Sequence, residues 1–244
     1  MRSLRAALSY FSILPGGVAA PVDSAAIAWL PFVGATVGGI AGSLALAVSH
    51  TAPPALAVAA AFGAGVVLTG AIHLDGFLDG CDAFFASVTA QRRREILKDP
   101  RHGTFAVAGA AVLVVVWVAA LSSLSAARLP AALALAGASA RWGAVVHAVR
   151  LPFVRGIPEF AARADRPPLA VLALGFALTV ILAVPLGIAG AIAAAVAIAS
   201  AAICMLWAES RLGGVRAGDV YGFAITVAEV AALVSLAATE GYRA

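Results

Sequence analysis

The chain has 244 residues, of which 63% are hydrophobic and 11% are charged, and its mean hydropathy is +1.02. A soluble domain usually carries about 25% charged residues, so this composition excludes an ordinary soluble protein and indicates one integral membrane domain over residues 1–244. The net charge of +4 comes from scattered arginines and one lysine. In a membrane protein such charges report orientation, so we expect no nucleic-acid partner.

The N-terminal segment has Arg2 and Arg5 before a short apolar stretch that ends at Pro15. It lacks a convincing cleavage site, and the pattern therefore predicts an amphipathic segment at the membrane interface rather than a signal peptide.

A helix that crosses a membrane needs about 20 mostly apolar residues. Seven segments meet this requirement, which predicts an all-α polytopic bundle of about seven transmembrane helices. The second segment is short, and it can run on into the polar motif that follows as one long helix. The turn around Pro185 and Gly187 makes the fifth and sixth segments an antiparallel pair. The seven segments are Ala25–Val48, Ala55–Ile72, Thr104–Leu124, Pro130–Val149, Pro168–Val184, Leu186–Trp207 and Val220–Ala238.

Basic residues are concentrated in every second loop between the predicted segments. If the N-terminus is cytoplasmic, the outer side holds only Arg128 and Arg243, and Arg141 lies within the fourth segment. Positive charge marks the cytoplasmic side, so we expect a multi-pass protein of the cell (inner or plasma) membrane, with its N-terminus inside, its C-terminus outside and its active site at the cytoplasmic face. The inner side would hold Arg2, Arg5, Arg92, Arg93, Arg94, Lys98, Arg101, Arg150, Arg155, Arg163, Arg166, Arg211 and Arg216.

Three carboxylates and a histidine lie within ten residues: His73, Asp75, Asp79 and Asp82. Spacings of four and three residues place the carboxylates on one face of a helix. Such anions repel one another unless a cation lies between them, and Mg²⁺ prefers oxygen ligands and is often shared with substrate phosphates. The motif therefore predicts a magnesium site, and the alternative is a solvated acidic helix end.

A basic run follows, and residues 92–98 are typical of an amphipathic helix near the interface. The triple arginine there is either a topological signal or a phosphate clamp, because arginine forks match phosphate oxygens. Residues 99–104 predict a turn in which Gly103 permits close backbone approach.

Arg141 is costly at membrane depth, so we expect it to face a polar interior and a partner; the alternative is that it snorkels to the interface. The segment 150–159 is either a lid or a plain connector. Gly213, Gly214 and Gly218 suit a backbone cradle for phosphate. Asp219 joins them or caps a helix, and Glu229 falls mid-span, where a structural role alone is hard to find.

Carboxylates, arginines and glycine-rich backbone at one end of a bundle favour metal-assisted transfer to or from a phosphorylated substrate. The motifs also carry a resemblance. Residues 70–82, residues 94–104, the isolated Arg141, the block from Leu212 to Glu229 and residues 11–15 together resemble the cobalamin synthase family, the adenosylcobinamide-GDP ribazoletransferases. The likeness runs nearly end to end. The chain departs from the family pattern at Ser12, Ile13, Ala217 and Thr226.

The resemblance implies that α-ribazole, or its 5′-phosphate, attacks the cobinamide-linked phosphorus of adenosylcobinamide-GDP, and that adenosylcobalamin or its phosphate forms while GMP leaves. Mg²⁺ would be held by Asp75, Asp79 and Asp82, and His73 or one aspartate would accept the hydroxyl proton. Further copies of the chain, or other enzymes of cobalamin synthesis, are candidate partners. Phosphate and substrate binding would fall to Arg94, Lys98, Arg101, Arg141, Gly213, Gly214, Gly218, Asp219 and Glu229.

Two rival interpretations remain at the level of sequence. One is another membrane transferase with aspartate-rich motifs, such as a CDP-alcohol phosphotransferase or an aromatic prenyltransferase, whose usual spacings differ from the one seen here. The other is a cation or metabolite transporter, which often shows internal repeats and sites near the midplane; the chain shows no clear repeat. Metal-dependent release of GMP separates the enzymes from the transporter.

Overall fold

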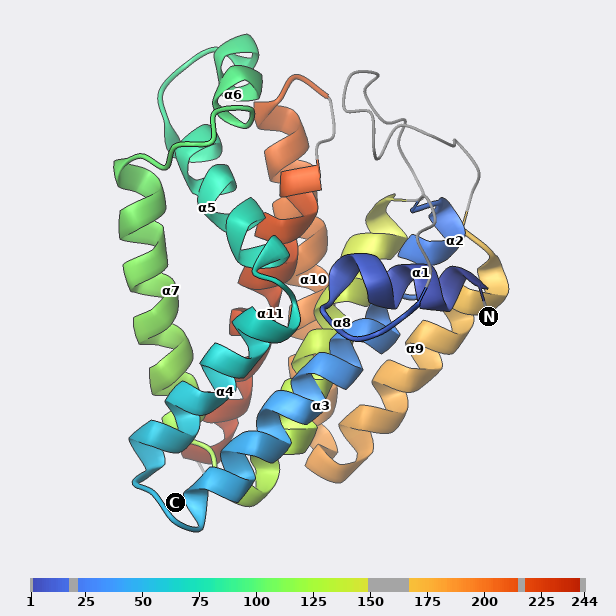
Figure 1. Ribbon diagram of the computed structural model, residues 1–244, viewed down its shortest axis with the longest axis vertical. Coiled ribbons are helices and arrows are strands. Elements are labelled where there is room, and N and C mark those ends of the chain that lie inside the picture. The colour runs from blue at the N-terminus through green and yellow to red at the C-terminus, as the bar shows by residue number, and fades with distance from the viewer. Residues whose placement is uncertain (1, 18–21, 149–166, 215–217, 242–244) are drawn as a thin grey trace.

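The computed structural model describes residues 2–17, 22–148, 167–214 and 218–241 (Figure 1). Within these ranges every regular element is a helix, as the composition predicts. The elements are α1 (Arg2–Phe11), α2 (Ser24–Ile27), α3 (Leu30–Ser49), α4 (Pro54–Leu68), α5 (Ile72–Phe85), α6 (Ala90–Ile96), α7 (Thr104–Ser122), the 3₁₀ turn η1 (Ala126–Arg128), α8 (Leu129–Ala148), α9 (Leu169–Ala183), the 3₁₀ turn η2 (Val184–Leu186), α10 (Gly187–Arg211) and α11 (Gly218–Gly241).

Five helical segments in the described ranges are long and apolar enough to cross a membrane, or six if the bent pair α4–α5 counts as one span. One of the five, Leu169–Arg211, contains both α9 and α10. Gly187, at φ +62°, reverses the chain there, and the two helices run in opposite directions, as the sequence predicts (Figure 1).

The break between α4 and α5 excludes the possibility, left open by the sequence, that one long helix continues into the acidic motif. The two helices meet at 91°. Gly70 and Ala71 adopt φ angles of +58° and +60°, and consecutive left-handed residues cannot continue a right-handed helix. The amide of Ile13 donates to the Leu68 carbonyl at 2.8 Å. The bend therefore separates an apolar helix from the helix that carries the carboxylates.

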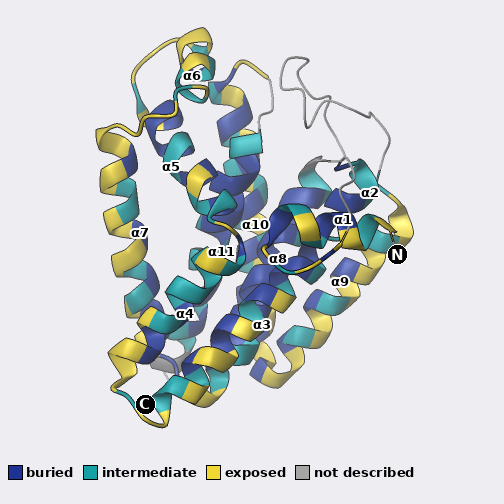
Figure 2. Ribbon diagram, viewed as in Figure 1, coloured by how far each residue is buried: buried dark blue, intermediate teal, exposed yellow. Residues whose placement is uncertain are grey.

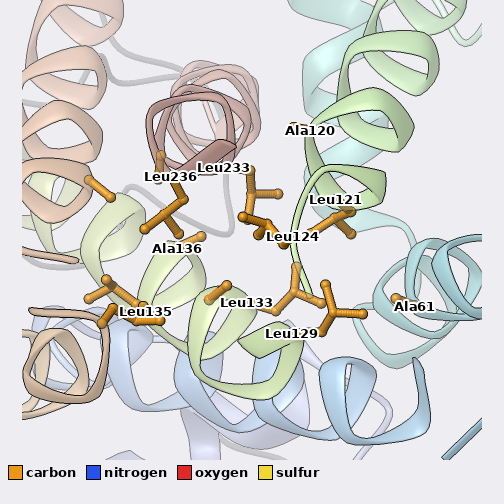
Figure 3. Packing of buried hydrophobic residues seen from close by; sticks show 14 of the residues in the cluster. Ala61, Ala120, Leu121, Leu124, Leu129, Leu133, Leu135, Ala136, Leu233 and Leu236 are labelled. Carbon is orange, nitrogen blue, oxygen red and sulfur yellow. The ribbon is translucent and has the colours of Figure 1, made fainter. Parts of the chain in front are cut away.

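Small residues bring α3 and α8 together. A Cβ atom on Gly34 would overlap the Gly137 carbonyl, and one on Gly38 would overlap the Leu133 carbonyl. Close backbone approach through small residues is how helices associate in lipid. Nearby, alanine and leucine side chains from α4, α7, α8 and α11 fill a buried cluster (Figure 3).

The outward faces of the bundle are apolar. Val107 and Val115 on α7, Ile181 on α9 and Ile188 on α10 are each more than 60% exposed, and exposed residues recur along α7 and α9 (Figure 2). A soluble monomer rarely exposes such a surface. The chain is therefore a multi-pass membrane protein.

The predicted amphipathic segment at the N-terminus is the helix α1. Ala6, Ala7 and Phe11 form its buried side, which packs on α2 and α3. Arg2 and Arg5 are exposed. The loop 150–159, interpreted from sequence as a lid or a connector, lies outside the described residues, as do Arg216 and Ala217.

Candidate active site

The site begins at the crossing of α5 and α11. A Cβ atom on Gly76 would lie 3.0 Å from the Gly222 Cα, and one on Gly222 would lie 2.9 Å from the Gly76 Cα. Only glycine pairs permit backbones this close. The contact brings Asp219, in the first turn of α11, beside Asp75 and Asp79 on α5, and these charges repel one another.

No described residue donates a hydrogen bond to the carboxylates of Asp75 and Asp219. Asp79 faces His102, whose Nδ1 lies 3.4 Å from Asp79 Oδ1, and its side chain is 16% exposed. Asp75 is exposed to solvent. Gathered anions are costly unless a cation joins them, and His102 is the one basic side chain of the described residues that pairs with this cluster, so the cluster has the chemistry of a cation site.

Asp82 differs from the other two carboxylates of the motif. Its Oδ2 accepts a hydrogen bond from the amide of Gly103, and its Oδ1 accepts one from the amide of Ala106 at 3.0 Å. A Cβ atom on Gly103 would lie 2.9 Å from Asp82 Oδ1, which explains the glycine. Asp82 therefore caps the start of α7.

The residues present are compatible with Mg²⁺. Among the described residues, no three His, Cys, Asp or Glu side chains form a ready-made metal site. Mg²⁺ keeps several waters, however, and is usually held by one or two carboxylates together with substrate phosphates. The oxygen donors of Asp75, Asp79 and Asp219 meet that requirement.

A cleft of about 320 Å³ lies beside these carboxylates. Asp75 and Asp219 line it together with Lys98, which follows α6, and Gly218. Lys98 therefore lines the same cleft as two carboxylates, and its predicted role in phosphate binding stays a prediction. Tyr10 and Phe11, from α1, line the cleft as well.

His73 borders two cavities, the cleft and an interior cavity of about 100 Å³. Its ring is 7% exposed, and its Nδ1 has no hydrogen-bond partner. Its carbonyl accepts from Thr226 Oγ1 at 3.2 Å. Thr226 thus gives α11 a neutral tie to α5.

Arg141 and Glu229 line the interior cavity and form an ion pair. Arg141 is 2% exposed and also donates to the Gly137 carbonyl at 3.0 Å. The expectation of a polar partner at membrane depth is confirmed, and Glu229 gains a structural explanation. Neither residue lines the cleft, and their predicted role in substrate binding stays a prediction.

The other basic residues hold helix ends. Arg93, 4% exposed, donates to the carbonyls of Ala83 and Phe84 at 2.6 and 2.8 Å. Arg211 Nε donates to the Phe84 carbonyl at 3.0 Å. Cations near a helix C-terminus are favourable because of the helix dipole. These two arginines therefore secure the end of α5.

Arg94, predicted to bind phosphate, donates from Nη1 to the Leu212 carbonyl at 2.6 Å and so joins α6 to the end of α10. Arg101 forms a two-pronged pair with Asp99 at 2.8 and 2.7 Å, and these hydrogen bonds lower the pKa of Asp99 to about 2. The guanidinium of Arg101 remains 86% exposed.

Gly213 and Gly214 end α10. Their φ angles are +77° and +81°, and their amides donate to the Ser210 and Glu209 carbonyls at 3.3 and 2.9 Å. This is the glycine ending common to helices. The two amides are thus engaged within the chain, whereas a phosphate cradle would need them free.

Several contacts in the structure could not be predicted from the sequence. His102 faces Asp79, and His147 Nε2 lies 3.4 Å from Glu209 Oε2 across α8 and α10. The two residues of the second pair are 62 positions apart, and no local pattern signals such a contact. The sequence pattern also assigns no binding role to the aromatic residues that line the cleft, Tyr10 and Phe11.

Comparison with known proteins identifies the family of this chain. The family model described as Cobalamin-5-phosphate synthase matches residues 3–237. A protein of Deinococcus radiodurans named adenosylcobinamide-GDP ribazoletransferase is 34% identical over 95% of this chain and 84% of its own length. Proteins of the same name from Klebsiella pneumoniae (34%, covering 97% and 99%) and Bradyrhizobium diazoefficiens (32%, covering 96% and 93%) are similar throughout. No solved structure matches. The chain belongs to the cobalamin-5-phosphate synthase family.

Proposed function

We propose that this protein is an adenosylcobinamide-GDP ribazoletransferase that acts in cobalamin synthesis. It transfers the cobinamide-phosphate group of adenosylcobinamide-GDP to α-ribazole or α-ribazole 5′-phosphate and releases GMP. Family membership over nearly the whole chain supports the reaction. The observation that assigns the reaction to a site is that Asp75, Asp79 and Asp219 lie together beside a cleft that Lys98 lines.

In this reaction the acceptor hydroxyl oxygen forms a bond to the cobinamide-linked phosphorus, and the bond from that phosphorus to the GMP oxygen breaks. The hydroxyl proton passes to His73 or to one of the aspartates. Lys98 neutralises charge on the phosphates. Asp82 and the arginines at the end of α5 position the helices from which the carboxylates project.

We propose Mg²⁺ as the cofactor, which one or two of Asp75, Asp79 and Asp219 would hold together with substrate phosphates. When bound, Mg²⁺ neutralises pyrophosphate charge and orients the phosphorus. Asp82 was the third ligand expected from sequence. Its oxygens already receive two amides, although a carboxylate retains further acceptor positions, so a direct comparison of Asp82 with Asp79 decides its role.

We propose seven crossings of the inner membrane, with the N-terminus and the site in the cytoplasm. The count follows if α4–α5 is one broken crossing and α9 and α10 are two. In support, α6 with its three arginines and the end of α10 with Arg211 lie at one end of the bundle, and the α3–α4 turn lies at the other (Figure 1). Cysteine accessibility at Ser87 and Thr51, measured in right-side-out and inverted vesicles, tests this orientation.

The deciding experiment uses the purified, detergent-solubilised protein with adenosylcobinamide-GDP and α-ribazole, with and without Mg²⁺. We expect GMP release that requires both acceptor and metal, and a cobalamin product detected by mass. Intact protein that releases no GMP would refute the proposal. Release without added metal after chelation would leave the transfer standing and refute the magnesium assignment.

A further inference from the structure

The cleft has two unlike walls. One wall carries the charged side chains of Asp75, Asp219 and Lys98. The other is apolar and aromatic, with Tyr10 and Phe11 from α1, Ile27 at the end of α2 and Leu30 at the start of α3. A ligand that suits both walls has a planar apolar part joined to an anionic or metal-bound part.

The aromatic wall is held in place by packing. The ring of Phe11 is 5% exposed, and the ring of Tyr10 meets it edge-on at a centroid distance of 4.9 Å. On the other side, Phe11 stacks on His73 at 6.4 Å with an interplanar angle of 27°. Phe11 thus links α1 to the first turn of α5, so the aromatic wall and the carboxylates have a fixed relation.

We propose that Tyr10 and Phe11 seat the heteroaromatic base of the acceptor nucleoside, and so determine which acceptors the enzyme uses. The inference rests on the proposed function and names the part of the site that binds α-ribazole. A benzimidazole base has an apolar face and, once it is joined to ribose, no N–H donor and a single acceptor nitrogen, so it loses at most one hydrogen bond against this wall.

The donor substrate suits this wall less well. Guanine carries several hydrogen-bond donors and acceptors, and burying polar groups without partners is unfavourable. The corrinoid ring system is far larger than a nucleoside, whereas a cleft of about 320 Å³ is of nucleoside size. The acceptor base is therefore the better match.

Two substitutions test the assignment, Tyr10→Leu and Phe11→Leu, with Phe176→Leu as the matched control. Phe176 lies on α9, packs on Trp142 and does not line the cleft. Loss of the Tyr10 ring, or of the Phe11 ring that supports it, should raise the KM for α-ribazole about tenfold. The KM for adenosylcobinamide-GDP should not change, and the control should match the wild type in both constants.

The outcomes separate this inference from the function on which it rests. A wild-type protein without GMP release refutes the function itself. An active wild type with an unchanged acceptor KM in both variants refutes the aromatic seat, and a rise confined to the donor KM assigns the wall to guanine instead. If Phe11→Leu fails to fold, Tyr10→Leu decides, because Tyr10 is only partly buried. Wild-type protein should also prefer α-ribazole to the smaller imidazole riboside, and equal kcat/KM values would contradict the proposal.

Discussion

The same two helices, α5 and α11, border two polar regions. The two regions differ in whether the protein compensates their charges. At the cleft, which Asp75 and Asp219 line and Asp79 adjoins, these three carboxylates repel one another, and the described residues supply no arginine or lysine bonded to them. In the interior, Arg141 and Glu229 neutralise each other. A charge that the protein leaves uncompensated is available to a ligand, whereas a compensated charge holds helices together. The following experiments test that distinction.

The largest effect is expected in the cleft. Asp75→Asn or Asp79→Asn should lower turnover by about 1,000-fold, the upper range for removing one charge-stabilising group, because each change removes an anionic oxygen from the cation site. The protein should remain folded, since repulsion is relieved. GMP release under saturating substrates measures the loss, with Glu95→Gln as an acidic control whose partner is Arg92. Near-normal turnover in both aspartate variants would contradict the cation site.

The interior pair should respond in stability instead. Glu229→Gln leaves the Arg141 charge buried without its partner, and such a loss destabilises a protein by about 3 kcal/mol. The double variant Arg141→Met/Glu229→Leu should recover most of the loss. The free energy of unfolding in mixed detergent–SDS micelles measures both. An unchanged stability with a raised substrate KM would instead support the binding role that the sequence predicts for these residues.

The helix crossing that creates the cleft should tolerate no added atom. Gly222→Ala places a Cβ 2.9 Å from the Gly76 Cα and 3.1 Å from the His73 carbonyl, and overpacking of this kind costs about 2 kcal/mol. Turnover should fall too, because α11 carries Asp219. Gly63→Ala is the matched control, since nothing lies within 4 Å of its added Cβ. Equal stability of the two variants would show that the crossing is not tightly packed.

The smallest effect concerns Asp82. Asp82→Asn weakens the cap of α7, and loss of a cap costs about 1 kcal/mol. We expect partial turnover that clearly exceeds that of Asp79→Asn, measured side by side at several Mg²⁺ concentrations. If the two variants are equally inactive while both remain folded, Asp82 binds the metal as its place in the motif predicts.

Local patterns predicted the local structure well. The spacing of Asp75, Asp79 and Asp82 predicts one helix, and α5 contains all three. The burial of Arg141 with a partner follows from the cost of an isolated charge at membrane depth. The first inference needs only the spacing of neighbouring residues, and the second needs only one energetic argument.

Contacts between distant segments were not predictable in this way. Asp219 lies beside Asp75 only because Gly76 and Gly222 are in contact, and no spacing in the sequence predicts that contact. The bend after α4 depends on the left-handed Ala71, a conformation that alanine rarely adopts. For Gly213 and Gly214 a local signal did exist, because a glycine pair after the last turn is typical of a helix end; the phosphate interpretation competed with it.

The arginines at the end of α5 have a consequence for biogenesis. The last carbonyls of α5 are bound by Arg93, which follows within ten residues, and by Arg211, which is made 127 residues after Phe84. Asp219 is made later still. When only the first half of the chain has been synthesised and inserted, α5 therefore lacks Arg211 at its end and Asp219 beside its acidic face. Nonsense mutations before codon 219 should leave inserted fragments without a working catalytic centre, and complementation by split genes should succeed only when the second fragment supplies α10 and α11 together.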